Sequence, residues 1–272
     1  MQHYAKKRFG QNFLIDNTII NQIVDCIHPQ ADDLMIEIGP GLGAMTKPLL
    51  TRLNHLNVIE LDRDIIPKLI KNCIFVDATN RDKLLVNEID VLKFDFAEFY
   101  LHQTSANKSG HKKLLRIVGN LPYNISTPVL FHLLKYRHVI EDMHFMLQKE
   151  VVDRIVASPG NKDYGRLSVM IQAFCDAQAL FEVPPYAFSP APKVNSAILR
   201  LQPNSQFEQQ INNFSLFETL IRQAFSQRRK TIKNTLKDLC SVEQIENAGL
   251  QMSQRAEELS VSDFARLYTE IA

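Results

Sequence analysis

The stretch Asp33-Leu34-Met35-Ile36-Glu37-Ile38-Gly39-Pro40-Gly41-Leu42-Gly43 joins an apolar run to a glycine-rich turn. The apolar run predicts a buried strand, and the residues from about Ala44 to Leu53 predict a helix. A strand that enters a helix through glycines brings backbone N–H groups close to a ligand. Gly39, Gly41 and Ala44 also satisfy the relaxed dinucleotide pattern GxGxxA, so this turn fits NAD and S-adenosylmethionine equally well.

Strands and helices alternate along the rest of the first half of the chain. A helix capped by Asp16 precedes the first strand, and further strands are predicted at 57–62, ending at Ile89-Asp90, ending at Val118 and at 142–147. This alternation is typical of right-handed βαβ units. It therefore predicts an α/β, Rossmann-like fold with a mainly parallel sheet.

The pattern changes in the second half. Residues 179–183 and 197–201 predict two strands around a proline-rich loop, forming a last hairpin antiparallel to the rest of the sheet. From Phe214 onward only helical periodicity remains. We therefore expect a ligand-binding domain over residues 1–203, in which residues 1–15 form an N-terminal loop, and a small α-helical domain over residues 204–272.

Composition narrows the class of protein. The 272 residues are 45% hydrophobic and 22% charged, which is typical of a soluble globular protein. A formal net charge of +1 means that a nucleic-acid partner would need a local basic patch. The four cysteines form no CxxC pair and the eight histidines lack metal-ligand spacing, so we expect no metal. The absence of a long apolar stretch and of a secretory signal predicts a cytoplasmic protein without membrane association.

Four glycine or polar positions fall at the ends of four successive predicted strands: Gly39, Glu60, Asp90 and Asn120. In an open parallel sheet the carboxyl ends of the strands are where ligands bind, so these positions predict one cleft. A carboxylate at Glu60 would bind ribose hydroxyls. Asp90 could accept a hydrogen bond from an adenine amine, with Asp95 as the nearby alternative.

The segment Asn120-Leu121-Pro122-Tyr123 favours methyl transfer over hydride transfer. The exocyclic amine of adenine is a poor nucleophile, because its lone pair is delocalised into the ring. The side-chain carbonyl of Asn120 and the backbone carbonyl of Leu121 can accept its two N–H bonds and aim the lone pair at a methyl carbon. Pro122 fixes the backbone and Tyr123 offers a stacking face. No general base is built into this segment, so catalysis would rest on positioning and loss of water.

Three other segments can complete such a site. Phe188 in the proline-rich loop is a candidate for the other side of a base sandwich. Asn12 and Leu14 precede the first helix and could close over the cofactor. Glu37, charged within an apolar strand, could face the positive sulfonium or amine of a methyl donor.

A basic cluster marks the C-terminal region. With about 100° per residue, the cations Arg222, Arg229, Lys230, Lys233 and Lys237 fall within an arc of roughly 100° if one continuous helix carries them. Such a face predicts contact with RNA phosphates. Lys6, Lys7 and Arg8 would add to it.

These motifs together resemble one family, the bacterial 16S ribosomal RNA adenine N6,N6-dimethyltransferases, or KsgA family. The resemblance extends over nearly the whole chain and is carried by residues 7–14, 37–43, 58–62, 119–128, 146–151, 164–169, 188–194 and 227–231. It implies a class I methyltransferase fold, S-adenosylmethionine as donor, and dimethylation of two adjacent adenosines near the 3′ end of small-subunit ribosomal RNA. It also implies action by a monomer on the assembling 30S subunit.

The resemblance also assigns residues by position. The cofactor residues would be Asn12, Leu14, Gly39, Glu60, Asp90 and Asn120, and the glycine turn adds Gly41. The target-base residues would be Asn120, Leu121, Pro122, Tyr123 and Phe188. Two other functions stay open: an adenine methyltransferase acting on 23S ribosomal RNA, and an RNA-binding assembly factor of the same fold that has lost catalysis.

Overall fold

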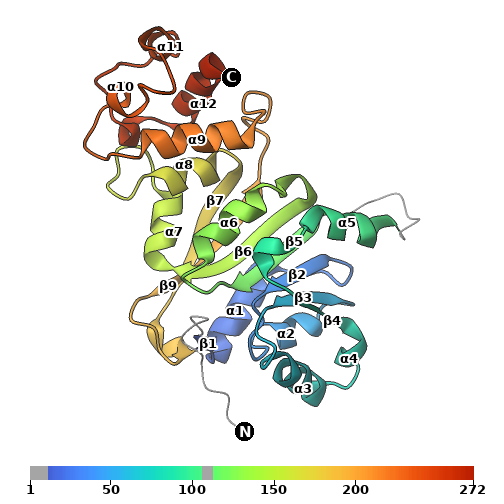
Figure 1. The fold of residues 1–272 in the computed structure, drawn as a ribbon. Helices are drawn as coiled ribbons and strands as arrows, with labels where there is room; N and C mark the ends of the chain where they lie inside the picture. The colour runs from blue at the N-terminus through green and yellow to red at the C-terminus, as the bar shows by residue number, and fades with distance from the viewer. Residues whose placement is uncertain (1–11, 106–112) are drawn as a thin grey trace. The chain divides into compact units, whose positions relative to one another are not determined.

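The computed structural model describes residues 12–105 and 113–272, and most of the sheet lies in the first of its two compact units. Strands of the main sheet follow the order β4-β3-β2-β5-β6-β9-β7 (Figure 1). They are β2 (Leu34–Ile38), β3 (Leu56–Glu60), β4 (Leu84–Glu88), β5 (Leu115–Asn120), β6 (Ile140–Gln148), β7 (Cys175–Val183) and β9 (Ser196–Pro203). A two-stranded sheet pairs β1 (Phe13–Leu14) with β8 (Phe188–Ser189).

The helices connect these strands and make up most of the C-terminal region. The α-helices are α1 (Asn17–Ile27), α2 (Thr46–Leu50), α3 (Ile66–Val76), α4 (Asn80–Lys83), α5 (Phe96–Ser105), α6 (Ser126–Leu134), α7 (Lys149–Val156), α8 (Arg166–Gln172), α9 (Phe214–Ala224), α10 (Ile232–Thr235), α11 (Val242–Asn247) and α12 (Val261–Ile271). Short 3₁₀ helices are η2 (Val91–Lys93), η3 (Arg137–Val139), η4 (Pro185–Ala187) and η5 (Ala256–Glu258). Within the described residues, no helix has both the length and the apolar character needed to cross a bilayer.

The directions of the strands confirm the α/β fold. β2 pairs in parallel with β3 and β5, β3 with β4, and β5 with β6, whereas β9 runs antiparallel to β6. The antiparallel final hairpin was expected from the sequence. The strands expected to end at 62 and 90 end earlier, at Glu60 and Glu88, and the one expected to end at Val118 continues to Asn120.

Helix α1 shows how local sequence signals build the core of the first unit. The carboxylate of Asp16 caps the helix by accepting from the N–H groups of Thr18 (2.9 Å) and Ile19 (3.2 Å). The apolar residues recur every three or four positions and are buried in one cluster with α2, α3 and the sheet: Ile20, Ile23, Val24 and Ile27. This packing fixes the helix that directly follows β1.

Gly119 sets the closest approach between two strands of the sheet. A Cβ atom at this position would lie 2.5 Å from the carbonyl oxygen of Ile38, a distance that real Cβ atoms do not reach. Only glycine therefore lets β5 pair with β2 here. The ends of these strands, Asn120 and Gly39, are thereby held next to each other.

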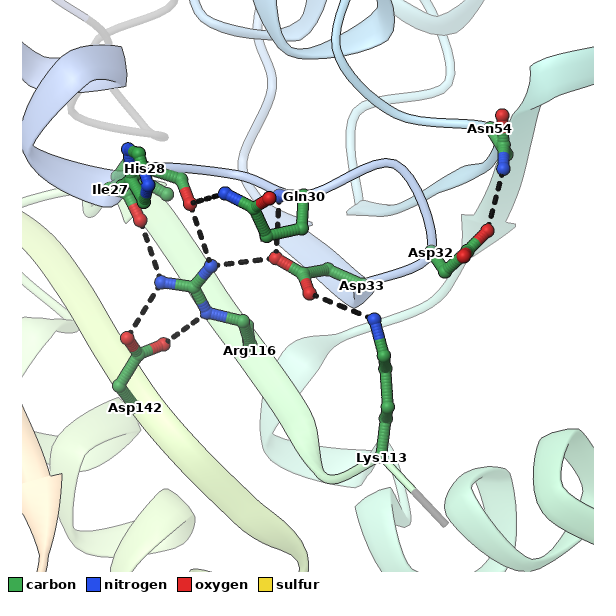
Figure 2. A network of polar contacts seen from close by, with 9 residues as sticks. All are labelled: Ile27, His28, Gln30, Asp32, Asp33, Asn54, Lys113, Arg116 and Asp142. Atoms are coloured by element: carbon green, nitrogen blue, oxygen red, sulfur yellow. Dashed lines mark hydrogen bonds and ion pairs between the residues drawn. The ribbon is translucent and has the colours of Figure 1, made fainter. Parts of the chain in front are cut away.

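A buried ion network closes the amino-terminal edge of the sheet (Figure 2). The Arg116 guanidinium donates from Nε (2.9 Å) and Nη2 (2.7 Å) to the two carboxylate oxygens of Asp142, and from Nη1 (2.7 Å) to Asp33. It also donates to the carbonyl oxygen of Ile27 (2.7 Å), at the end of α1. One arginine thus links β5, β6, the start of β2 and the C-terminus of a helix.

The chain divides into two compact units. The first holds the described residues up to Lys149 together with Ala179–Leu201, and the second holds Glu150–Gln178 and Gln202–Ala272. This division differs from the expected boundary at residue 203, because α7 and α8 group with the C-terminal helices. The core of the second unit includes the buried residues Phe217, Leu220, Phe264 and Tyr268.

The second unit also lacks the continuous basic helix that the sequence predicted. Helix α9 ends at Ala224 and α10 begins only at Ile232, so no continuous helix carries the five cations. Thr231 is extended, forms a β-bridge with Arg255, and is followed by a bond from the N–H of Ile232 to the carbonyl oxygen of Gln254 (2.8 Å). This pairing holds Thr231 and Ile232 against a distant segment, and residues 225–230 form turns and bends between the two helices.

Candidate active site

A cavity of about 820 Å³ lies at the carboxyl ends of the parallel strands in the first unit. The ends of β2, β3, β4 and β5 are adjacent in the sheet, and Gly39, Glu60, Asp90 and Asn120 all line this cavity. Every residue expected to hold the cofactor lines it: Asn12, Leu14, Gly39, Gly41, Glu60, Asp90 and Asn120. The target-base segment Asn120–Tyr123 lines it as well.

The glycine turn lines the cavity. The N–H of Gly39 donates to the carbonyl oxygen of Ile59 (3.0 Å), which holds the turn against β3. Gly41 has a φ of 57°, and a Cβ atom here would lie 3.3 Å from the ring of Phe13. A side chain at Gly41 would therefore be strained and would press on the N-terminal segment that borders the cavity.

Glu60 is a buried carboxylate at the end of β3, only 8% exposed. It accepts a hydrogen bond from the N–H of Asp62 (2.8 Å). Burial raises the pKa of Glu60, while the backbone N–H groups of Asp62, Leu61 and Gly41 act in the opposite direction. A carboxylate so placed can accept hydrogen bonds from sugar hydroxyls.

Glu37 is a second buried carboxylate of the cavity wall, 1% exposed. Its Oε2 atom accepts a hydrogen bond from the hydroxyl group of Thr46 on α2 (2.7 Å). Burial raises the pKa of Glu37 to about 7, and the nearby Glu60 carboxylate adds to the shift. No described basic residue forms an ion pair with Glu37. A cationic ligand in the cavity would therefore favour the ionised form of Glu37 and neutralise its charge.

Asp90 and Asp95 have different surroundings. Asp90 lines the cavity, and its carboxylate caps η2 by accepting from the N–H of Leu92 (3.0 Å). Asp95 is exposed, caps α5 through the N–H groups of Ala97 and Glu98, and is not part of the cavity wall. The geometry favours Asp90 as the residue that meets a ligand.

The amide of Asn120 has a defined orientation. Its Nδ2 atom donates to the backbone carbonyl oxygen of Asn12 (3.1 Å), next to β1. The side-chain oxygen is thereby left to accept a hydrogen bond from a ligand. Two backbone hydrogen bonds hold the turn that follows. The N–H of Leu121 donates to the carbonyl oxygen of Met146 (3.2 Å), and the N–H of Ile125 donates to the carbonyl oxygen of Pro122 (3.1 Å).

Comparison with known proteins identifies the family. The family described as "Ribosomal RNA adenine dimethylase" matches residues 2–272. The chain belongs to this family. It is 48% identical over 265 residues to "Ribosomal RNA small subunit methyltransferase A" of Pasteurella multocida, covering 97% of this chain and 89% of that protein. It is also 48% identical over 270 residues to the protein of that name from Haemophilus influenzae, covering 99% and 91%.

Solved structures show the same fold. A dimethyladenosine transferase from Plasmodium falciparum matches with a TM-score of 0.77 and 26% identity, covering 94% of this chain and 95% of that one. The 23S rRNA methyltransferase ErmE matches with a TM-score of 0.66 and 22% identity, covering 96% and 99%. The fold of this dimethylase-family chain is therefore that of class I methyltransferases, as the sequence predicted.

Phe188 is not part of the cavity wall in this family member. It is 3% exposed, and strand β8 places it opposite Leu14 of β1. It packs in the core cluster of the first unit rather than presenting a ring to the cavity. Among the aromatic candidates named from the sequence, the one that lines the cavity is Tyr123.

The five basic residues assigned to RNA lie in the second unit of this dimethylase-family chain. Arg222, Arg229, Lys230, Lys233 and Lys237 are all exposed, and none of them forms an ion pair with a described residue. The neighbouring Arg228 differs, because it contacts Glu257 (3.4 Å) and the carbonyl oxygen of Lys162 (2.8 Å). Residues 6–8, and the rest of the expected loop before Asn12, lie outside the described residues.

Sequence reasoning missed several residues of this site. The hydroxyl group of Thr46 donates to Glu37, and the ring of Phe13 lies beside Gly41 of the glycine turn. Ser196 forms a hydrogen bond with the hydroxyl group of Tyr123. A hydroxyl residue nine positions after a buried glutamate is a weak signal, and Ser196 has no local signal at all. In the described part of the chain no group of three or more His, Cys, Asp or Glu side chains is arranged to hold a metal ion.

Proposed function

We propose that this protein transfers methyl groups from S-adenosylmethionine to N6 of two adjacent adenosines in the 3′-terminal hairpin of 16S ribosomal RNA. Membership of the adenine dimethylase family and the names of the relatives that are 48% identical support the reaction and the small-subunit RNA. The observation that carries the proposal is the position of Asn120. Its side-chain oxygen is available beside the cavity where the glycine turn and two buried carboxylates meet.

The residues of the cavity fit this donor. When bound, S-adenosylmethionine supplies an electrophilic methyl group on a positively charged sulfur. We assign Glu60 to the ribose hydroxyls, Asp90 to the adenine amine of the donor, and Gly39 and Gly41 to close backbone approach. Asn12 and Leu14 border the same cavity and would cover the bound donor.

The target amine would be activated by geometry. The Asn120 side-chain oxygen and the Leu121 carbonyl oxygen accept its two N–H bonds, which directs the nitrogen lone pair toward the methyl carbon. Burial raises the pKa of Tyr123, so its phenol stays protonated near neutral pH and does not serve as a base. The proton of the methylated amine would leave to water after transfer. An adenine in a loop or single strand is the easier substrate, because it need not be extruded from a duplex.

The second unit would bind the RNA. Five exposed cations form no ion pair with a described residue, so neutralising phosphates costs no internal contact: Arg222, Arg229, Lys230, Lys233 and Lys237. We further propose that the protein acts as a monomer on the assembling 30S subunit in the cytoplasm. Phe188 keeps a supporting role, since its packing against Leu14 helps to hold the segment that borders the cavity.

The test is transfer of labelled methyl groups to small ribosomal subunits that lack the modification. N6,N6-dimethyladenosine in 16S RNA is expected. Label in 23S RNA would favour the alternative substrate, and no label in either RNA would favour a non-catalytic assembly factor. Asn120→Ala should lower turnover about 100- to 1000-fold while donor binding falls much less. Asn54→Ala, which removes an exposed amide that pairs with Asp32, is the matched control and should be neutral.

RNA binding is tested by its salt dependence. Replacing Arg229 and Lys233 by alanine should weaken binding and lower the slope of log affinity against log salt by about 2. Arg228→Ala should change the slope less, because Arg228 is already engaged by Glu257. An unchanged slope in the double variant would remove these residues from the interface.

A further inference from the structure

The hydroxyl group of Tyr123 reaches from the cavity wall into the scaffold of the first unit. Its oxygen lies 2.7 Å from Oγ of Ser196, and either atom can donate. Tyr123 is half-buried and lines the cavity, whereas Ser196 is 0% exposed. The hydrogen bond thus joins a residue that faces the ligand to one that no ligand can reach.

Strand pairing fixes the position of Ser196. It is the first residue of β9, and its Cα partner is Gln148 at the end of β6. The preceding residue is also held, since the carbonyl oxygen of Asn195 accepts from the N–H of Lys149 (2.9 Å). On the opposite side of β6, Asn120 pairs with Met146. Asn120 and Ser196 are therefore both placed by register against the same central strand.

The other hydrogen bonds of the turn at Tyr123 act on its backbone. The carbonyl oxygen of Tyr123 accepts from the hydroxyl group of Ser126 (3.2 Å), and the turn is closed by the bond from Ile125 to Pro122. These bonds fix the backbone of the turn but not the two side-chain torsions of Tyr123. A ring that serves as a stacking face must also keep one orientation, and a bond at its far end supplies that restraint. Stacking alone would not require the hydroxyl group.

We propose that Ser196 is a positioning residue that holds the Tyr123 ring in the orientation in which its face meets the target base. The inference rests on the proposed function, since the base is the one whose amine is methylated beside Asn120. It gives the antiparallel strand β9 a role in the active site, because the start of that strand sets the angle of the stacking face. The face and the amine-binding carbonyl groups are then aligned through β6.

A double-mutant cycle tests this role. Tyr123→Phe and Ser196→Ala each remove one partner of the bond and keep the ring, so each should lower the turnover number about 3- to 10-fold. Donor affinity should stay within about twofold, because neither Tyr123 nor Ser196 is among the residues assigned to the donor. The double variant should be no slower than the slower single variant, since both changes remove the same bond. Thr104→Val, which deletes a buried hydroxyl group on α5, is the control for a general loss of stability and should leave turnover unchanged.

Multiplicative losses in the double variant, or unchanged turnover in Ser196→Ala, would overturn the proposal. A second measurement does not depend on activity. In protein labelled with ¹³C at the ζ carbon of tyrosine, the signal lost in Tyr123→Phe belongs to Tyr123, and Ser196→Ala should shift that signal alone. An unmoved signal would overturn the positioning role even if the enzyme is active. If the wild type transfers no methyl group, the proposed function fails, and the shift still decides whether Ser196 holds the hydroxyl group of Tyr123.

Discussion

Buried charge is treated in opposite ways at the two ends of the same sheet. At the amino-terminal edge Arg116 bonds both oxygens of Asp142 and one of Asp33, and these side chains are only 10%, 7% and 9% exposed (Figure 2). At the carboxyl edge Glu37 and Glu60 are equally buried, and no basic residue of the described chain pairs with either. The buried charges at the first edge are paired within the protein, whereas those at the second edge have no partner until a ligand supplies one.

The difference separates scaffold from binding site. A buried charge without a partner is unfavourable, and a carboxylate responds by holding its proton to higher pH. Burial accordingly raises the pKa of Glu37 to about 7. A ligand that carries a positive sulfonium and an ammonium group would supply the missing charge. The unpaired carboxylates at this edge are therefore an electrostatic argument for the proposed donor that is independent of family membership.

The largest effect is expected from breaking the complete edge. Arg116→Met leaves two buried carboxylates without their partner and should lower the free energy of unfolding by about 3–5 kcal/mol, measured by urea denaturation at pH 7.5. Arg116→Lys keeps the charge but not the bidentate contact with Asp142, so its loss of stability should lie between zero and that of Arg116→Met. The folded fraction of either variant should bind the donor with wild-type affinity. A loss below about 1 kcal/mol in Arg116→Met would show that the network is not a stabilising unit.

At the carboxyl edge, removing a buried charge should raise the free energy of unfolding rather than lower it. The folded protein holds the proton of Glu37 up to pH about 7, whereas the unfolded chain releases it near 4.5. Between these values the folded state binds more protons, so Glu37 makes the protein less stable as the pH rises. Glu37→Gln should therefore be more stable than the wild type by about 1–3 kcal/mol at pH 8 and nearly equal at pH 4.5.

Comparing Glu37→Gln with the wild type at each pH isolates the contribution of Glu37 to stability. His144 titrates in the other direction, because burial lowers its pKa to about 4, and it is present in both proteins. Thr46→Val removes the hydroxyl group that favours ionised Glu37, so the pKa of Glu37 should rise further and the total loss of stability with rising pH should be larger than in the wild type. Equal stability of Glu37→Gln and wild type at pH 8 would mean that Glu37 is not strained at this edge.

A smaller effect is expected on donor binding. If the donor's positive charge requires ionised Glu37, affinity for S-adenosylmethionine should drop about tenfold from the plateau above pH 8 to pH 6. Glu37→Gln should bind more weakly above pH 7 and lose this pH dependence. Calorimetric titrations at pH 6, 7 and 8 measure both. An exposed carboxylate on α5, Glu98, provides the matched control as Glu98→Gln, which should keep the wild-type profile.

The two edges also differ in how far the sequence could predict them. The carboxyl edge follows from local signals, since each strand end is followed by a glycine, carboxylate or amide, and parallel pairing collects them. The Arg116 network joins residues 26 and 83 positions apart in the chain, and no periodicity marks such a pair. The strands and the cleft were therefore predictable, and the charge network was not.

Two differences between the expected and the observed structure have the same physical origin. Helical periodicity was expected from Phe214 onward, but the chain turns after Ala224, and Thr231 pairs with Arg255. Phe188 was expected to lie in a proline-rich loop with its ring available for stacking. The pairing of β8 with β1 buries it instead. In both cases a contact between distant segments overrode a correct local pattern.

The smallest effect should come from the solvent side of the complete edge. Lys113 approaches Asp33 at 3.6 Å, but its side chain is 49% exposed. Because water and salt screen such a pair, Lys113→Ala should cost no more than about 0.5–1 kcal/mol, and this loss should vanish in high salt. The Arg116→Met loss should persist in the same salt, since that pair is shielded from ions. If Lys113→Ala were as costly as Arg116→Met, burial would not be what distinguishes the two contacts to Asp33, and the contrast between the edges would lose its physical basis.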